Sequence, residues 1–182
     1  MNKLLLTLKL LVSPRPTWAQ LLGGSTSSSE SERKLFYPLV LVVALSAVGL
    51  FWREVNLTVG DVVISAIAQA IAYILSLYIC VIAISWGLNF VVEKDAFVAP
   101  GKVKTFVIYC LAILMLLHIV KNLLPAESAF FDLFPIFLII PVWQAAEFLH
   151  IDKDNTGFFV VGATALLLVT PWVINALLSF FV

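Results

Sequence analysis

The chain has 182 residues, of which 62% are hydrophobic and 12% are charged, and its mean hydropathy is +1.08. Soluble domains carry about 25% charged residues, so water is the wrong solvent for most of this surface. The 11 basic and 11 acidic residues cancel to a net charge of zero. Composition therefore predicts a polytopic membrane protein rather than a soluble domain, and nothing basic and aromatic is arranged for nucleic acid.

Residues 1–34 form the predicted cytoplasmic N-terminal region. Between Met1 and Val12, one face of a short helix collects apolar side chains at helical spacing, and Pro14 ends that helix. We expect the helix to lie on the membrane surface through Leu4, Leu5, Leu8, Leu11 and Val12. The alternative is a signal peptide cleaved after Ala19, but Lys9 divides its apolar stretch. Residues 23–31 read GGSTSSSES and are predicted to be a flexible linker.

Five apolar windows follow in the predicted membrane domain, residues 35–182. A helix needs about 20 residues to cross the roughly 30 Å hydrocarbon core. The windows are 35–52, 62–92, 103–123, 130–148 and 158–182. Each is continuously apolar rather than alternating, so helices are expected and not barrel strands. The predicted fold is all-α, with five transmembrane helices.

The basic residues predict the orientation of these helices. Nine lie in segments that are internal if the N-terminus is internal: Lys3, Lys9, Arg15, Arg33, Lys34, Lys94, Lys102, Lys104 and Lys153. The external segments hold Arg53 and Lys121. We therefore expect a cytoplasmic N-terminus and an external C-terminus.

The second window offers the clearest signal for helix packing. Small residues let membrane helices approach closely, and they recur here at helical spacing: Ser65, Ala68, Ala72, Ser76 and Ala83. Gln69 and Tyr73 run beside this ridge and are candidate functional polar positions. Ile74 and Leu77 are expected to face lipid. Gly162, Ala163 and Ala165 open the fifth window, whereas Pro135, Pro141 and Pro171 predict kinks in the fourth and fifth.

Ionisable groups near the membrane are the other candidate site residues. Glu147 and His150 are three residues apart near the inner end of the fourth window, and could relay a proton or hold a metal. The alternative is an interfacial pair without chemistry, because water is about one turn away. His118 has no obvious ligand partner in the sequence and is expected to be an interfacial histidine. Cys80 and Cys110 are expected to be buried small residues outside any disulfide.

Catalytic and cofactor-binding motifs are missing from the sequence. Residues 152–157 resemble the start of a calcium-binding loop, but the twelfth position is Ala163 and a membrane window follows. No phosphate-binding loop, HExxH or GxSxG motif is present. An enzyme is not expected, and no cofactor or metal is implied.

The opening of the chain resembles that of bacterial Yip1-domain proteins. Residues 10–18 read LLVSPRPTW, a Leu-rich segment that leads into Ser-Pro and a Trp, and residues 36–39 (FYPL) enter the first window in a similar way. The five-span plan also agrees with that family. The signatures of its eukaryotic members are absent, since the third window reads VIYC at 107–110, so Rab GTPase binding is not carried over. The resemblance implies a non-catalytic integral protein of the bacterial cytoplasmic membrane.

Three functions remain open from the sequence. The first is a membrane organiser or adaptor that contacts the lipid bilayer, other membrane proteins or further copies of itself. The second is a small transporter or channel, lined by Gln69, Tyr73, Gln144 and Glu147 between kinked helices. The third, a membrane enzyme using Glu147 and His150, is disfavoured by the missing motifs.

Overall fold

The computed structural model describes residues 3–24, 27–52, 57–93, 97–124 and 133–179, and the described chain is helical almost throughout. No strand occurs in these ranges; an isolated antiparallel bridge joins Val92 and Ile151. Four helical stretches are long and apolar enough to cross a membrane, namely Ser28–Phe51, Val59–Val91, Pro100–Leu123 and Lys153–Leu178. They indicate a protein embedded in a membrane.

The fourth predicted window has a shorter helix than expected. Its described part, Phe134–Phe148, consists of a 3-10 turn, η3 (Phe134–Leu138), followed by α8 (Ile139–Phe148). Residues 130–132 of the window lie outside the described residues. By length alone the structure therefore has four candidate spans and one shorter apolar helix.

The N-terminal region contains two helices that pack against the bundle. α1 (Lys3–Val12) ends before Ser13, and α2 (Pro14–Leu22) begins with prolines at positions where helical N–H groups have no partner. The five residues expected to face lipid, Leu4, Leu5, Leu8, Leu11 and Val12, are all exposed. The opposite edge of α1 buries Leu6 and Leu10. One apolar side of α1 thus packs against the protein, and the other apolar side is exposed.

The Ser-rich linker is shorter than predicted. α3 (Ser28–Ser31) is helical, and Ser31 is fully buried. A π-helical turn, η1 (Glu32–Phe36), follows and leads into α4 (Tyr37–Ser46). The longer turn fits Pro38, which has no N–H to donate. The first long helical stretch therefore begins at Ser28, because α3, η1 and α4 follow one another without a break.

The remaining helices begin and end at recognisable signals. A 3-10 turn, η2 (Ala47–Trp52), closes the first helix, and α5 (Val59–Val91) starts with a capping box between Thr58 and Asp61. α6 (Pro100–Leu123) has proline in its first turn. η4 (Lys153–Asn155) precedes α9 (Thr156–Ser179), which contains Pro171.

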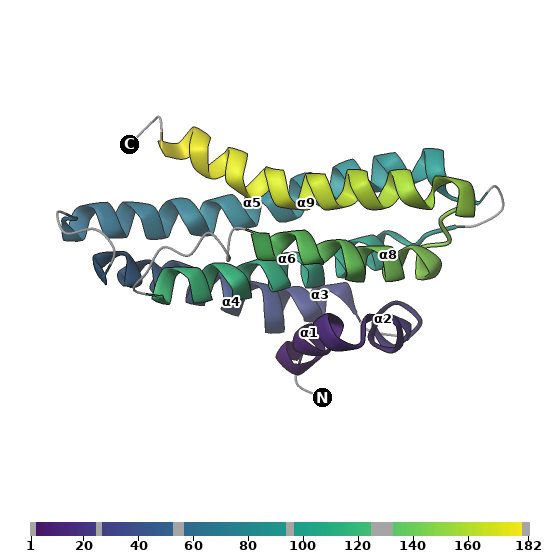
Figure 1. The fold of residues 1–182 in the computed structure, drawn as a ribbon, viewed down its shortest axis with the longest axis horizontal. Coiled ribbons are helices and arrows are strands. Elements are labelled where there is room, and N and C mark those ends of the chain that lie inside the picture. The colour runs from purple at the N-terminus through teal and green to yellow at the C-terminus, as the bar shows by residue number, and fades with distance from the viewer. Residues whose placement is uncertain (1–2, 25–26, 53–56, 94–96, 125–132, 180–182) are drawn as a thin grey trace.

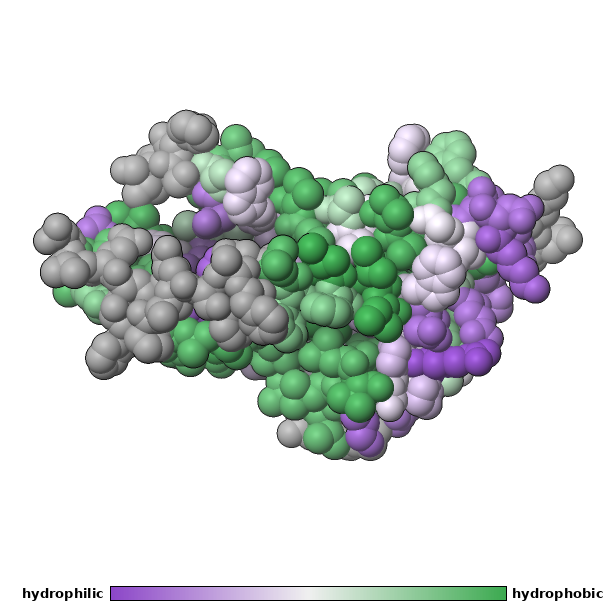
Figure 2. Space-filling view, viewed as in Figure 1, coloured by the Kyte–Doolittle hydropathy of each residue, from purple (hydrophilic) through white to green (hydrophobic). Residues whose placement is uncertain are grey.

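α6 lies at the centre of the bundle. Two thirds of its most apolar window is buried, 67% against 33% for the last helix, and it contacts α4, α5 and α9. Figure 1 shows α5 and α9 side by side along the top, α4, α6 and α8 below them, and α1 and α2 at the lower edge. Figure 2 shows apolar side chains over the middle of this face and polar ones gathered at the end where α8 meets α9.

The predicted packing ridge of α5 is confirmed at its middle. Ala72 and Ser76 are buried, as are Gln69 and Tyr73 beside them. The expectation that Leu77 faces lipid was wrong, since its side chain is fully buried in the core. Leu77 lies one turn after Tyr73 and so shares its face. Leu75 is 43% exposed and points outward instead.

Candidate functional site

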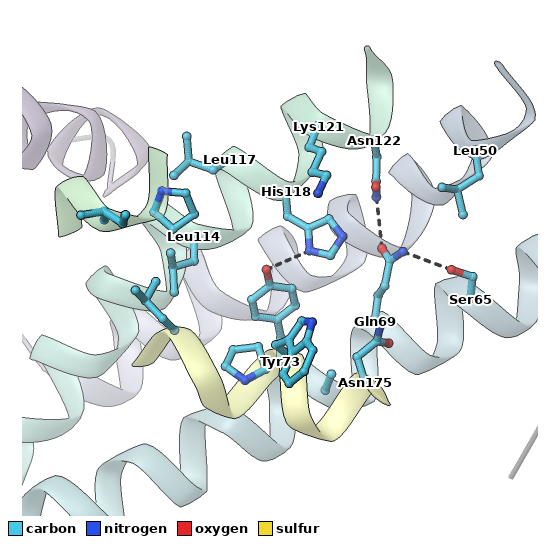
Figure 3. A pocket seen from close by; sticks show the side chains of 16 residues that line it. Leu50, Ser65, Gln69, Tyr73, Leu114, Leu117, His118, Lys121, Asn122 and Asn175 are labelled. Atoms are coloured by element: carbon cyan, nitrogen blue, oxygen red, sulfur yellow. Dashed lines mark hydrogen bonds between the residues drawn. The ribbon is translucent and has the colours of Figure 1, made fainter. Parts of the chain in front are cut away.

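One cavity, named the outer cavity for its place at the ends of the helices, opens opposite the end where α8 meets α9. Its volume is about 620 Å³, within the range of small-molecule sites. Polar and apolar side chains share its wall (Figure 3). The polar ones are Ser65, Gln69, Tyr73, His118, Lys121, Asn122 and Asn175.

One side of this outer cavity is a chain of amide and hydroxyl hydrogen bonds. Asn122 Nδ2 donates to Ser46 Oγ at 2.9 Å and to Gln69 Oε1 at 3.2 Å. Gln69 Nε2 donates to Ser65 Oγ at 3.2 Å, while Ser46 Oγ donates to the Val43 carbonyl at 2.7 Å. The chain links α4, α5 and α6 through hydrogen bonds made within the protein. Its main role is therefore to hold three helices in register.

Tyr73 and His118 form a second polar group. The Tyr73 hydroxyl and His118 Nδ1 are 3.0 Å apart, and the rings meet edge to face. Figure 3 shows the other ring nitrogen of His118, Nε2, directed to the side of the cavity where Gln69 and Asn122 lie. His118 thus has a hydrogen-bond partner, Tyr73, on another helix far away in the sequence.

Among the described residues that line the cavity, the only Asp, Glu, Lys or Arg side chain is that of Lys121. Lys121 lies one turn after His118 on α6, and both side chains turn toward the same space (Figure 3). No Asp or Glu occurs among the described residues that line the cavity. The lining also includes apolar side chains, among them Ile136 and Trp172, both exposed.

Gly49 allows this end of the bundle to close. A Cβ atom placed on Gly49 would overlap the main-chain oxygen of Asn122 and lie 3.3 Å from the Leu123 Cα. A side chain at Gly49 would therefore push η2 away from α6. This movement would also disturb the hydrogen bond between Ser46 and Asn122. This contact is not predictable from the sequence, because a glycine near the end of an apolar window has no local signature of a close approach.

Glu147 and His150 do not make the pair that the sequence suggests. Glu147 Oε1 accepts from Arg15 Nη2 at 2.9 Å, and both side chains are more than half exposed. The structure thus joins Glu147 to α2. Such an exposed ion pair contributes little to stability.

His150 has a main-chain role at the end of α8. Its φ of 53° is in the left-handed region. The Ile151 N–H donates to the Ala146 carbonyl at 3.1 Å and the His150 N–H donates to the Glu147 carbonyl at 3.3 Å. These are the two bonds of a Schellman motif, which usually has glycine at this position.

The outer cavity does not continue along the predicted transport path. Gln69 and Tyr73 line it, whereas Gln144 and Glu147 are not among its lining residues. The stretch of α6 from Phe106 to Met115 is almost completely buried along the bundle. Cys80 and Cys110 are buried free thiols, as predicted. Within the described ranges, no three His, Cys, Asp or Glu side chains gather closely enough to hold a metal.

Comparison of the chain with protein-family models, with curated proteins and with solved structures finds no match.

Proposed function

We propose that the chain is a non-catalytic, Yip1-like integral membrane protein that organises or links components at the cytoplasmic side of a bacterial inner membrane. Its core is five crossings with the N-terminus inside, and its N-terminal helices form a platform fixed to the bundle. The observation that carries the proposal is the attachment of α2 to α8 through Trp18.

The attachment combines burial with a hydrogen bond. Trp18 is fully buried, and its Nε1 donates to the Pro141 carbonyl at 2.8 Å. Its ring lies 5.6 Å from Phe106 and 6.5 Å from Tyr109, measured between centroids. Aromatic groups of this size dominate the energy of such contacts. The platform is therefore held in one position relative to the membrane helices.

The platform leaves groups open to lipid and to partners. α1 keeps the apolar face of Leu4, Leu5, Leu8, Leu11 and Val12 exposed, which suits insertion into the cytoplasmic leaflet. Lys3 Nζ is fixed to Ser31 Oγ at 3.1 Å, so α1 is joined to the start of the first long helix. Arg15 remains 66% exposed beside Glu147 and is available to a partner from the cytoplasm.

Main-chain pairing supports the fifth crossing. The Glu93 N–H donates to the His150 carbonyl at 3.1 Å, and the Asp152 N–H donates to the Val91 carbonyl at 3.0 Å. The C-terminal ends of α5 and α8 therefore lie at the same end of the bundle. α6 starts from that end and runs to the opposite one (Figure 1). The chain must then return across the bundle before Ile151. η3 and α8 together span about 25 Å, and bilayers adapt to a mismatch of a few ångströms.

Photo-crosslinking in native membranes tests the adaptor role. A photoreactive residue at Arg15 should give a discrete protein adduct, whereas one at Leu8 should mark lipid. Leu45, 62% exposed on α4, is the matched control for general lipid contact. Lipid adducts alone from every position tested on α1 and α2 would contradict an adaptor.

A small transporter is the second candidate, favoured by the polar cavity with Pro135 and Pro171 in its wall. Alternating access would expose that cavity to each side of the membrane in turn. In a chain with Cys80 and Cys110 replaced by alanine, a cysteine at Asn175 should react with an impermeant reagent from outside only. Reaction from both sides would favour transport over the adaptor role.

A further inference from the structure

The outer cavity has no part in the adaptor role, whose contacts lie at the opposite end of the helices. Its volume of about 620 Å³ is large enough for the head of an amphiphile. Lys121 lines the cavity but already has an interaction within the protein, so no ligand contact is assigned to its ammonium group. The Tyr73–His118 pair and the apolar lining are the features that select a ligand.

The Tyr73–His118 pair offers a polar atom to the cavity in either of its hydrogen-bonding arrangements. Nδ1 of His118 is used by Tyr73, while Nε2 is directed to the side of the cavity where Gln69 lies and has no hydrogen bond to any residue drawn in Figure 3. If the Tyr73 hydroxyl donates to Nδ1, a neutral ring carries its proton on Nε2 and donates from there. If Nδ1 donates to the hydroxyl, Nε2 accepts instead. A ligand hydroxyl can accept and donate, so it fits both arrangements, whereas a carbonyl or an anion fits the first alone.

The rest of the lining adds an amide and an apolar surface. Asn175, on α9, brings a carboxamide that can also donate and accept. Ile136 is 53% and Trp172 72% exposed, and both line the cavity as well. Exposed apolar side chains of a membrane-embedded protein contact lipid tails, which are as apolar as they are, so a lipid can reach the cavity beside them. A ligand with a hydroxyl head and an apolar body matches this lining.

We propose that the outer cavity binds a neutral lipid with a free hydroxyl head, of the diacylglycerol class. His118 Nε2 makes the main hydrogen bond to the ligand hydroxyl, and Asn175 offers a second. The acyl chains leave the cavity past Ile136 and Trp172. This site goes beyond the adaptor role, and its failure would leave that role untouched.

The test compares ligands that differ in the head group alone, by native mass spectrometry and thermal stabilisation of the full-length protein in detergent. The probes are 1,2-dioctanoylglycerol, propane-1,2-diol dioctanoate, which has hydrogen in place of the hydroxyl, and dioctanoyl phosphatidic acid, which has phosphate there. Dioctanoylglycerol should bind about fivefold more tightly than the diester without a hydroxyl, the difference expected for one neutral hydrogen bond. Equal binding of these two, or tighter binding of phosphatidic acid, would overturn the proposal.

Matched variants locate the hydroxyl. His118→Phe keeps a ring but removes both nitrogens, so the preference for dioctanoylglycerol should disappear. Gln144→Leu removes an amide that does not line the cavity and should keep the preference. A preference retained in His118→Phe, or lost in Gln144→Leu, would contradict the site.

A photoreactive analogue of dioctanoylglycerol gives a second readout on the unmodified protein, which does not depend on the folding of a variant. With the photoreactive group on an acyl chain, it should label the segment around Trp172. Labelling confined to α1 and α2 would place the lipid elsewhere and overturn the proposal.

Discussion

The indole nitrogen of Trp18 donates a hydrogen bond to the main-chain oxygen of Pro141, 2.8 Å away and 123 residues further along the chain. The bond attaches the N-terminal helices to the short helix α8. Arg15 and Glu147 meet beside it. Two segments that are far apart in the sequence thus form one packed unit.

Replacing Trp18 tests how that unit is held. Trp18→Ala removes a fully buried aromatic side chain and should lower the free energy of unfolding by about 3–5 kcal/mol. Trp18→Phe keeps an aromatic ring but loses the donor, so a smaller loss of about 1–2 kcal/mol is expected. Unfolding in detergent measures both, and trypsin cleavage after Lys9 should accelerate in Trp18→Ala. Trp86→Phe, at a 68% exposed position, is the control; an equal effect there would remove the special role of Trp18.

Gly49→Ala tests the close approach of η2 to α6. The added methyl group would overlap the Asn122 carbonyl, and backbone cannot move as a flexible side chain can. We expect the free energy of unfolding to fall by about 1–3 kcal/mol and the packing of η2 against α6 beside the outer cavity to loosen. Gly162→Ala is the matched control, since a Cβ there meets nothing within 4 Å. Equal tolerance of both substitutions in a detergent-stability assay would show that η2 is not in close contact with α6.

Three substitutions test which face of α5 packs against the rest of the bundle. Leu77→Ala leaves a cavity in the core and should lower the free energy of unfolding by about 2–5 kcal/mol. Leu75→Ala changes an exposed side chain and should cost much less. Ala72→Leu should destabilise by about 1–3 kcal/mol through overpacking, because Ala72 is 2% exposed. Thermal unfolding of the three proteins in one detergent gives the comparison, and a more damaging Leu75→Ala would mean that α5 is rotated.

His150→Gly separates a main-chain role from a chemical one. A Cβ at positive φ costs about 1–2 kcal/mol, so glycine should raise the free energy of unfolding by about 1 kcal/mol. His150→Ala keeps the Cβ and should stay close to the unmodified protein. Chemical denaturation measures the difference. Lower stability of the glycine variant would show that the imidazole itself contributes to folding.

The broad architecture could be predicted from the sequence because the physics is local. Long apolar runs separated by charged gaps indicate membrane helices, and small residues at helical spacing indicate a packed face, as Ala72 and Ser76 show. The Pro14 stop and the exposed apolar face of α1 follow from the same local rules. These features need no knowledge of which segments meet.

The candidate site was harder to predict from the sequence, because its contacts join segments that are far apart along the chain. Gln69 and Tyr73 were identified on α5, but their partners Asn122 and His118 lie on α6. Leu77 was misplaced because α5 is apolar on all sides, although its spacing of four from Tyr73 was a usable signal. Gly49 had no such signal. Its importance arises from the Asn122 main chain, which comes next to it only in the folded bundle.

The side of the membrane on which the C-terminus lies tests the five-crossing account most directly. The distribution of basic residues predicts a cytoplasmic N-terminus, and five crossings would then place the end of α9 outside. A dual reporter that is active only in one compartment, fused after Val182, measures this. We expect an external signal, with cysteine labelling at Asn155 from the cytoplasm alone. A cytoplasmic C-terminus would mean an even number of crossings and would contradict the passage of Phe134–Phe148 through the membrane.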